Sequence, residues 1–155
     1  MRRPNRSVDE QTAYELLNRV TEGCLAMIDT DGMPYVTPVN AVYCPEDHCL
    51  YFHCACEGKR YDALHARSEV CFVAAPDHEV IGPRFTTHYK SVMVRGQATY
   101  IEDADEKRRT LIYVTERLAP GELAKRPSVV DAYFANVAMV KISIESVTAK
   151  INHDA

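Results

Sequence analysis

The sequence predicts an α+β protein, mostly β, in which a six-stranded antiparallel sheet closes into a small barrel with flanking helices. Three observations lead to this expectation. The chain has 155 residues, a length that suits one domain and buries enough surface to fold without a metal or a disulfide. Six segments have the composition or alternation of strands, and turn signals separate them. Consecutive hairpins within one domain often close into a barrel, because closure removes exposed sheet edges.

The first element in the chain is a helix. Ser7 and Glu10 form a capping-box pattern, with Ser7 as the N-cap. Apolar residues then recur at the spacing of one helical face, at Ala13, Leu16, Leu17 and Val20. We expect this face to pack on the sheet, and Gly23 to end the helical region.

Five strands follow, separated by turns and one short helix. We expect them over residues 24–30, 33–44, 49–55, 69–75 and 89–102. Asp31 and Gly32 form a strong hairpin turn signal between the first two. Pro34 and Pro38 confine parts of the second strand to a sheet edge or a bulge, because proline cannot donate to a ladder. Gly96 lies in the middle of the fifth strand and predicts a bulge or bend.

The other segments complete the arrangement. Residues 58–66 predict a short helix, and residues 77–88 a polar loop with Gly82 and Pro83. Asp103 and Glu106 repeat the capping pattern before a second amphipathic helix, and a shorter helix is expected near residues 128–136. Alternation over residues 140–145 gives the clearest half-buried strand in the chain.

Composition and charge exclude several classes of protein. Hydrophobic residues make up 46% and charged residues 26%, which excludes a disordered or fibrous chain. No apolar run approaches the roughly 20 residues that cross a bilayer, so we expect no membrane partner. The net charge of −4 and pI near 5.8, with scattered Lys and Arg, argue against a nucleic-acid partner. Six cysteines without a recognisable secretory signal indicate free thiols and a cytoplasmic location.

The segment LYFHCACEGKRYDAL, residues 50–64, is the densest in chemistry. A strand ends, and a turn with Gly58 opens a helix that begins with Lys59 and Arg60. Free backbone N–H groups at a helix start favour an anion, and two cations beside them suit a phosphate. The alternative is a solvated helix start with ordinary surface cations. His53 and Cys54 should point to opposite faces of the strand, so His53 is poorly placed to activate Cys54 as a nucleophile.

A structural zinc site is a second interpretation of the same region. Potential ligands gather within thirteen positions, at Cys44, His48, Cys49, His53, Cys54 and Cys56. Strand alternation divides them between two faces. Zinc fingers require a second ligand pair downstream, and none follows here. We therefore predict no metal site and interpret these cysteines as small, partly buried apolar side chains.

Four segments in their order and spacing carry a resemblance to a known family. They are the MRRPNR start with its capped helix, DTDGMPYVTPVNAVY, LYFHCACEGKRYDAL and PRFTTHYKSVMVRGQA. The chain resembles the FMN-binding split-barrel superfamily that contains pyridoxamine 5'-phosphate oxidase, and most of all its nitroimidazole-resistance (Nim) reductase-like branch. The resemblance covers nearly the whole chain.

The resemblance implies a fold and a site. The fold is a single FMN-binding domain over residues 1–155, a six-stranded Greek-key split barrel that forms a homodimer with two FMN molecules in clefts at the interface. Phe85, Thr86 and Thr87 would approach the flavin from the other subunit. The full set of implied cofactor-binding residues is Pro38, Val39, Asn40, His53, Cys54, Ala55, Gly58, Lys59, Arg60, Phe85, Thr86, Thr87 and Ser91.

The chain also departs from the oxidase. The oxidase has an Arg and a Lys on the strand that lines the flavin, where this chain has Pro38 and Tyr43. Its C-terminal Trp and Arg, which help to hold pyridoxal phosphate, have no match in residues 141–155. The resemblance therefore implies FMN binding without substrate recognition of the oxidase type.

We thus expect an FMN-dependent oxidoreductase that reduces a small acceptor, such as a nitroimidazole, by two electrons. His53 is the predicted catalytic residue, since a histidine can donate a hydrogen bond or a proton near neutral pH. Packing against the flavin is the alternative role for His53. The alternative function is a flavin- or haem-binding module without turnover, in which His53 and a neighbouring Cys would be iron ligands.

Overall fold

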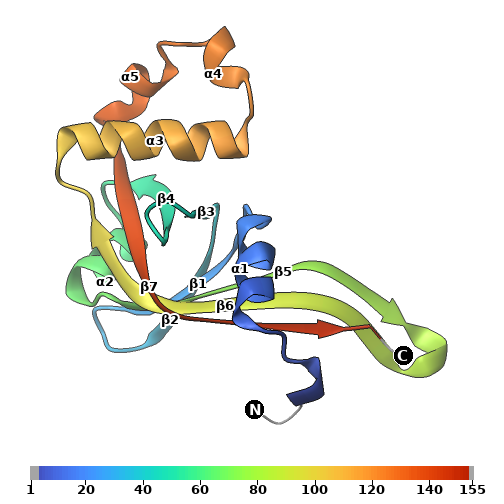
Figure 1. The fold of residues 1–155 in the computed structure, drawn as a ribbon. Helices are drawn as coiled ribbons and strands as arrows, with labels where there is room; N and C mark the ends of the chain where they lie inside the picture. Colours follow the sequence, from blue (N-terminus) through green and yellow to red (C-terminus); the bar gives the residue numbers. More distant parts are fainter. Residues whose placement is uncertain (1–3, 154–155) are drawn as a thin grey trace.

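The computed structural model describes residues 4–153, so the first half of the MRRPNR start lies outside the described residues (Figure 1). One antiparallel sheet dominates it, with strand order β2-β1-β5-β6-β7-β4-β3. The elements in chain order are η1 (Pro4–Arg6), α1 (Glu10–Asn18), β1 (Gly23–Ile28), β2 (Pro34–Val39), β3 (Val42–Cys44), β4 (Cys49–Ala55), α2 (Lys59–Ala66), β5 (Glu69–Ile81), η2 (Gly82–Arg84), β6 (Thr86–Tyr100), α3 (Ala104–Leu118), α4 (Glu122–Lys125), α5 (Val129–Phe134) and β7 (Val137–Asn152).

The sheet curves until its two edge strands approach each other. β2 and β3 lie at opposite ends of the strand order, yet only Asn40 and Ala41 separate them in the chain. Because successive Cα atoms are 3.8 Å apart, three steps bring the two edges within about 11 Å. No ladder joins β2 to β3 within residues 4–153, so the hydrogen-bonded sheet does not close.

The described sheet has seven strands, and the expected count of six was wrong. The single strand predicted over residues 33–44 divides at Asn40 and Ala41, where the chain crosses from one edge of the sheet to the other. The expected edge position of Pro34 and Pro38 is confirmed, since β2 pairs only with β1. An edge strand has one side without a partner strand, so it tolerates prolines, which lack an N–H group, better than a central strand does.

The loop expected over residues 77–88 is instead a two-stranded arm. β5 and β6 remain paired as far as Ile81 and Thr86, after a register shift between Ala74 and Asp77. A short turn through η2 closes the arm, and Phe85 takes the left-handed conformation there. Most arm residues are exposed on both faces, so the alternation that reveals half-buried strands is absent from this part of the sequence.

Of the two predicted helix caps, the one at α3 is confirmed and the one at α1 is not. Asp103 caps α3, with Oδ1 accepting from the Glu106 N–H at 2.8 Å. At α1, Asp9 is the N-cap and accepts from the Thr12 N–H at 2.8 Å, so the predicted Ser7 cap was wrong. Ser7 instead pairs with β7 through a bridge to Lys150.

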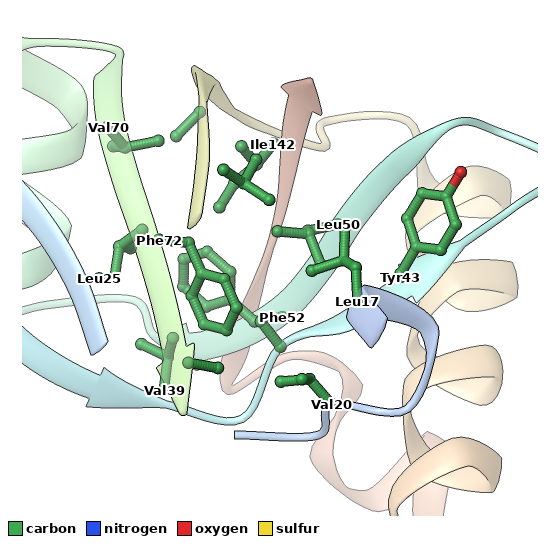
Figure 2. Packing of buried hydrophobic residues seen from close by; sticks show 14 of the residues in the cluster. Leu17, Val20, Leu25, Val39, Tyr43, Leu50, Phe52, Val70, Phe72 and Ile142 are labelled. Carbon is green, nitrogen blue, oxygen red and sulfur yellow. The ribbon is translucent and has the colours of Figure 1, made fainter. Parts of the chain in front are cut away.

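Two hydrophobic clusters pack on the two faces of the sheet. The larger lies under α1, with the rings of Phe52 and Phe72 at its centre (Figure 2). The second fills the space between β4, β7 and α3 around Tyr51 and Met139. β4 is therefore buried on both faces from Cys49 to Phe52, and its first exposed side chain is His53.

Gly96 confirms the predicted bulge. The β6–β7 register shifts between Arg95 and Gly96. A Cβ atom at Gly96 would lie 2.0 Å from the Ser143 carbonyl oxygen, so only glycine fits this close approach of two strands.

No helix of the described chain is long and apolar enough to span a membrane.

Candidate cofactor-binding site

The end of β4 alternates between the two faces of the sheet, as the strand period predicted. His53 and Ala55 are exposed, whereas Cys54 between them is buried. Burial raises the pKa of the Cys54 thiol, which keeps it protonated at neutral pH. His53 and Cys54 therefore serve different faces and do not form a nucleophilic pair.

A tight turn carries the chain from β4 into α2. Gly58 has a φ of 99°, a backbone conformation that residues with a Cβ atom rarely adopt. No side-chain hydrogen bond caps α2 among the described residues. The first N–H groups of a helix have no intrahelical acceptor, and they favour an anion. These features make the start of α2 a candidate anion-binding position.

Arg60 joins the start of α2 to the edge strand β2. Its Nη2 donates to Thr37 Oγ1 at 2.9 Å and to the Pro38 carbonyl oxygen at 3.3 Å. Its Nε is buried and has no hydrogen-bond partner within residues 4–153. A buried cationic donor without an acceptor is unfavourable, so the guanidinium fits an anionic ligand such as a phosphate.

Lys59 is already paired in this structure. Its Nζ lies 2.8 Å from Asp29 Oδ2, and the Asp29 side chain is only 4% exposed. Asp29 also accepts from the N–H groups of Asp31 and Met33, which shapes the β1–β2 turn. The hydrogen bond from Lys59 and those from the backbone hold the pKa of Asp29 below its usual value, and Asp29 in turn raises the pKa of Lys59. Much of the positive charge of Lys59 is therefore neutralised within the protein.

A cleft of about 660 Å³ lies beside the end of β2. Its walls are residues 19–24, Pro38, and residues 73–76 with His78 of β5. Asn40 donates to the Thr21 carbonyl oxygen at 3.3 Å, which ties the crossing between the sheet edges to the same segment. Val39 is buried in the core. Pro38, Val39 and Asn40 were expected to line the flavin. Of these three, Pro38 lines the cleft and also accepts a hydrogen bond from Arg60.

His53 lies on the other face, in a pocket of about 290 Å³ beneath α3 and α5. Partial burial lowers the pKa of the imidazole, and the positive charge of Arg60 lowers it further. The ring is therefore neutral at pH 7, with one nitrogen that donates a hydrogen bond and one that accepts. The effect of Arg60 also indicates that His53 and the start of α2 are close in space.

The potential zinc ligands do not converge. No group of three or more His, Cys, Asp or Glu side chains suitable for a metal ion occurs in the described part of the chain. Cys44 and Cys49 are buried opposite each other in the β3–β4 hairpin. Both ring nitrogens of His48 contact tyrosine hydroxyls, Nε2 with Tyr14 at 2.9 Å and Nδ1 with Tyr43 at 3.2 Å.

The remaining predicted residues lie on the arm, away from α2. Phe85 at its tip is 98% exposed, and Thr86 and Thr87 continue from it into β6. β5 leads to this tip over 13 residues, a path of up to about 40 Å at 3.3 Å per residue. Figure 1 shows α2 and the arm tip at opposite ends of the molecule. Ser91 lies at the base of the arm, opposite Lys150.

Comparison with known proteins identifies the family. A family model described as pyridoxamine 5'-phosphate oxidase matches residues 9–151. The chain belongs to this family. A search of curated proteins returned no match.

Solved structures share the fold of this pyridoxamine 5'-phosphate oxidase family member. A candidate 5-nitroimidazole antibiotic resistance protein from Bacteroides thetaiotaomicron is 26% identical, with a TM-score of 0.77 over 94% of this chain and 86% of that one. A flavocytochrome from Azotobacter vinelandii is 22% identical, with a TM-score of 0.83 over 99% and 72%. An FAD and heme binding protein from Mycobacterium smegmatis is 19% identical, with a TM-score of 0.79 over 97% and 76%.

Two residues near the family's expected phosphate position were not found from the sequence. Asp29 pairs with Lys59, and Thr37 accepts from Arg60. The sequence placed Asp29 in the strand expected over residues 24–30 and Thr37 in an edge strand. The structure keeps Thr37 in the edge strand β2, whereas Asp29 follows the end of β1 at Ile28. Their second role depends on contacts with α2, which lies far along the chain, and no local pattern reports such contacts.

Proposed function

We propose that this member of the pyridoxamine 5'-phosphate oxidase family is a cytoplasmic FMN-dependent oxidoreductase that reduces a small acceptor such as a nitroimidazole. One observation carries the proposal: Arg60 stands at the start of α2, and its buried Nε has no acceptor in the described part of the chain. An FMN phosphate at this position would supply that acceptor. FMN would supply the transfer of two electrons, a reaction that no side chain performs.

The residues of the chain would bind and orient the cofactor. Arg60 would hold the phosphate together with the N–H groups that follow Gly58, and Lys59 would add a weaker attraction because Asp29 shares its charge. The main chain near Pro38, Val39 and Asn40 would meet the polar edge of the ring system. Cys54 and Ala55 would lie beside the cofactor at the end of β4.

His53 would act on the acceptor. A nitro group accepts two electrons and two protons to become a nitroso group and water, and a reduced nicotinamide is the donor class that we propose. The neutral imidazole of His53 can hold an N–H donor toward the acceptor oxygen, and this role suits its lowered pKa.

A homodimer belongs to the same proposal. Phe85, Thr86 and Thr87 are too far from α2 to serve the site of their own chain, so only a second chain could bring them to it. Apolar side chains also remain exposed on three strands of the sheet, at Val36 of β2, Val73 of β5 and Met93 of β6, and Val73 and Met93 are direct neighbours in the β5–β6 ladder. Exposed apolar patches are typical of interfaces.

The second candidate is a binding module for flavin or haem without turnover. The exposed imidazole of His53 supports it, because an accessible histidine can be an axial ligand of haem iron. Solved structures of the same fold include proteins named for heme as well as FAD. The absorption spectrum of the purified protein separates the two, since haem has an intense Soret band that flavin lacks.

The decisive experiment identifies the bound cofactor and its reactivity. We expect mass spectrometry of the purified protein to find FMN, anaerobic NADH or NADPH to bleach its absorbance, and a nitroimidazole to restore it. Failure to bind FMN at micromolar concentrations would refute the proposal. Retention of FMN without any bleaching would favour the binding module.

A further inference from the structure

The pocket beside His53 is separate from the cleft that borders β2. It lies between the ends of β4 and β7, α3 and α5, and has a volume of about 290 Å³. Besides His53, its lining residues are Leu111, Thr115, Val129, Val130, Tyr133 and Val137. This is just below the range of about 300–1,000 Å³ that is typical of small-molecule sites, so the pocket suits a small ligand.

The walls of this pocket are apolar and uncharged. Four of the lining residues are Leu or Val. The Thr115 hydroxyl is already used, since it donates to the Leu111 carbonyl oxygen at 2.7 Å. Tyr133 is 59% exposed and stands at the rim. His53 is thus the only lining side chain that titrates near neutral pH, among the described residues.

The apolar walls and the single imidazole together indicate which class of ligand the pocket would bind. A pocket with aliphatic walls favours apolar surface, and removing an ion from water without a partner is costly. A single imidazole in such a wall offers one directed hydrogen bond to a polar substituent. A small, flat, uncharged aromatic molecule with one acceptor group satisfies both requirements.

The pocket also adjoins the proposed cofactor site. β4 passes directly from His53 to the Gly58 turn and Arg60. His53 lines the pocket, and the charge of Arg60 at the start of α2 lowers the pKa of its imidazole, so the pocket and the start of α2 are close to each other.

We propose that this pocket binds the electron acceptor, an uncharged single-ring or fused-ring aromatic whose polar group faces His53. The inference rests on the proposed function for the identity of the ligand as acceptor. Binding of the aromatic itself needs no cofactor and is tested without one.

The first test uses the flavin-free protein and nitrobenzene as the probe. We expect saturable shifts of the methyl NMR signals of Val129 and Val137. The anionic analogue 4-nitrobenzoate should bind at least about tenfold more weakly, a difference of about 1.4 kcal/mol. Shifts confined to other parts of the protein, or equal binding of the two probes, would overturn the assignment.

The second test fills the pocket. Thr115→Met places a longer side chain in it and should weaken nitrobenzene binding about tenfold. Ile112→Met is the matched control, because Ile112 is on the same helix, 42% exposed, and outside the pocket. Equal nitrobenzene affinity in Thr115→Met and wild type, with unchanged circular dichroism, would refute the proposal.

With FMN bound, Thr115→Met should raise KM for a neutral nitroimidazole about tenfold and leave FMN affinity unchanged. An unchanged KM would contradict the acceptor role of the pocket. If FMN does not bind to the wild-type protein, the proposed function fails, whereas the nitrobenzene titration still decides whether the pocket is a site.

Discussion

Two adjacent cations at the start of α2 differ in what they offer a ligand. Lys59 is 57% exposed and paired with a nearly buried carboxylate, whereas Arg60 is held against β2 with an unsatisfied donor. Spacing alone treated them as equal phosphate ligands. We therefore propose that Arg60 contributes more to phosphate binding, because its buried Nε has no hydrogen-bond partner within residues 4–153.

We therefore predict that Arg60→Ala weakens FMN binding more than Lys59→Ala. A hydrogen bond to a charged group contributes roughly 1.5–3 kcal/mol, so Arg60→Ala should lower the affinity by about 10- to 100-fold. Fluorescence titration with FMN measures the effect. Riboflavin, which lacks the phosphate, is the control ligand and should bind both variants like wild type. Equal FMN affinities in wild type, Arg60→Ala and Lys59→Ala would refute the assignment of the phosphate to the start of α2.

Two substitutions test the role of His53 in catalysis. His53→Ala removes the hydrogen-bond donor together with the titratable group, whereas His53→Gln removes only the titratable group. Because its pKa is lowered, we expect the neutral ring to act as a hydrogen-bond donor. His53→Ala should slow reoxidation of the reduced protein by a nitroimidazole about tenfold, the equivalent of one hydrogen bond. His53→Gln keeps a donor and should recover much of the rate in stopped-flow measurements.

Other outcomes assign His53 differently. Loss of about 10²–10⁴ in rate in both variants would indicate that the imidazole transfers a proton. Weaker FMN binding with normal turnover would indicate packing against the flavin. Wild-type rates and affinities in both variants would exclude His53 from the mechanism.

At the scale of elements, the Lys59–Asp29 pair connects α2 to the β1–β2 hairpin. The folded-state pKa of Asp29 is lowered, so the unfolded chain binds more protons between the two pKa values. The stabilisation is complete above the usual Asp pKa of about 3.9 and is lost as pH falls toward the folded-state value. Acid should therefore loosen this junction.

We predict that Asp29→Asn flattens part of this acid dependence. Urea unfolding at several pH values between about 3 and 7 gives the free energy of unfolding for wild type and variant. The two curves should converge as pH falls below about 3.9. Asp105→Asn is a suitable control, because Asp105 is exposed in the first turn of α3. Parallel curves for wild type and Asp29→Asn would show that the pair does not stabilise the fold.

The elements that the sequence predicted well are those whose side chains pack in the hydrophobic clusters. β4 begins and ends at the expected residues, because its aromatic and apolar side chains pack in both clusters. The arm was missed, since an exposed two-stranded ribbon has no burial pattern and its Gly82 and Pro83 suggest a loop. The N-cap of α1 was misplaced because Ser7 and Asp9 can both cap, and the bridge of Ser7 to Lys150 decided between them.

The candidate site was predictable only in part for a related reason. Strand and helix patterns indicated the turn at Gly58 and the cations that follow it. The contacts that distinguish Lys59 from Arg60 join segments that are distant in the chain, Asp29 to Lys59 and Thr37 to Arg60. The pocket beside His53 likewise depends on α3 and α5, and its residues have no common motif.

At the scale of the whole molecule, the arm requires an explanation. The ladder between β6 and β7 reaches Tyr89, and Asn152 of β7 also donates to the Thr87 carbonyl oxygen. Beyond these contacts the arm is a two-stranded ribbon with Phe85 98% exposed at its tip. If the arm of one chain covers the cofactor site of another, each site combines the α2 start of one protomer with the arm tip of its partner. A chain of 17.5 kDa should then sediment as a dimer of about twice that mass.

Subunit mixing tests this arrangement. Phe85→Asn keeps the left-handed backbone, which asparagine tolerates, and should weaken FMN binding without lowering Tm. Arg60→Ala impairs the other half of each site. In a mixed dimer of the two variants, one site carries both substitutions and the other carries neither. We therefore expect mixing to restore tight FMN binding at half the sites of each heterodimer, as measured by fluorescence titration.

If the arm served its own chain, every site would keep one defect and mixing would restore nothing. Sedimentation as a monomer with FMN bound would exclude the shared site altogether.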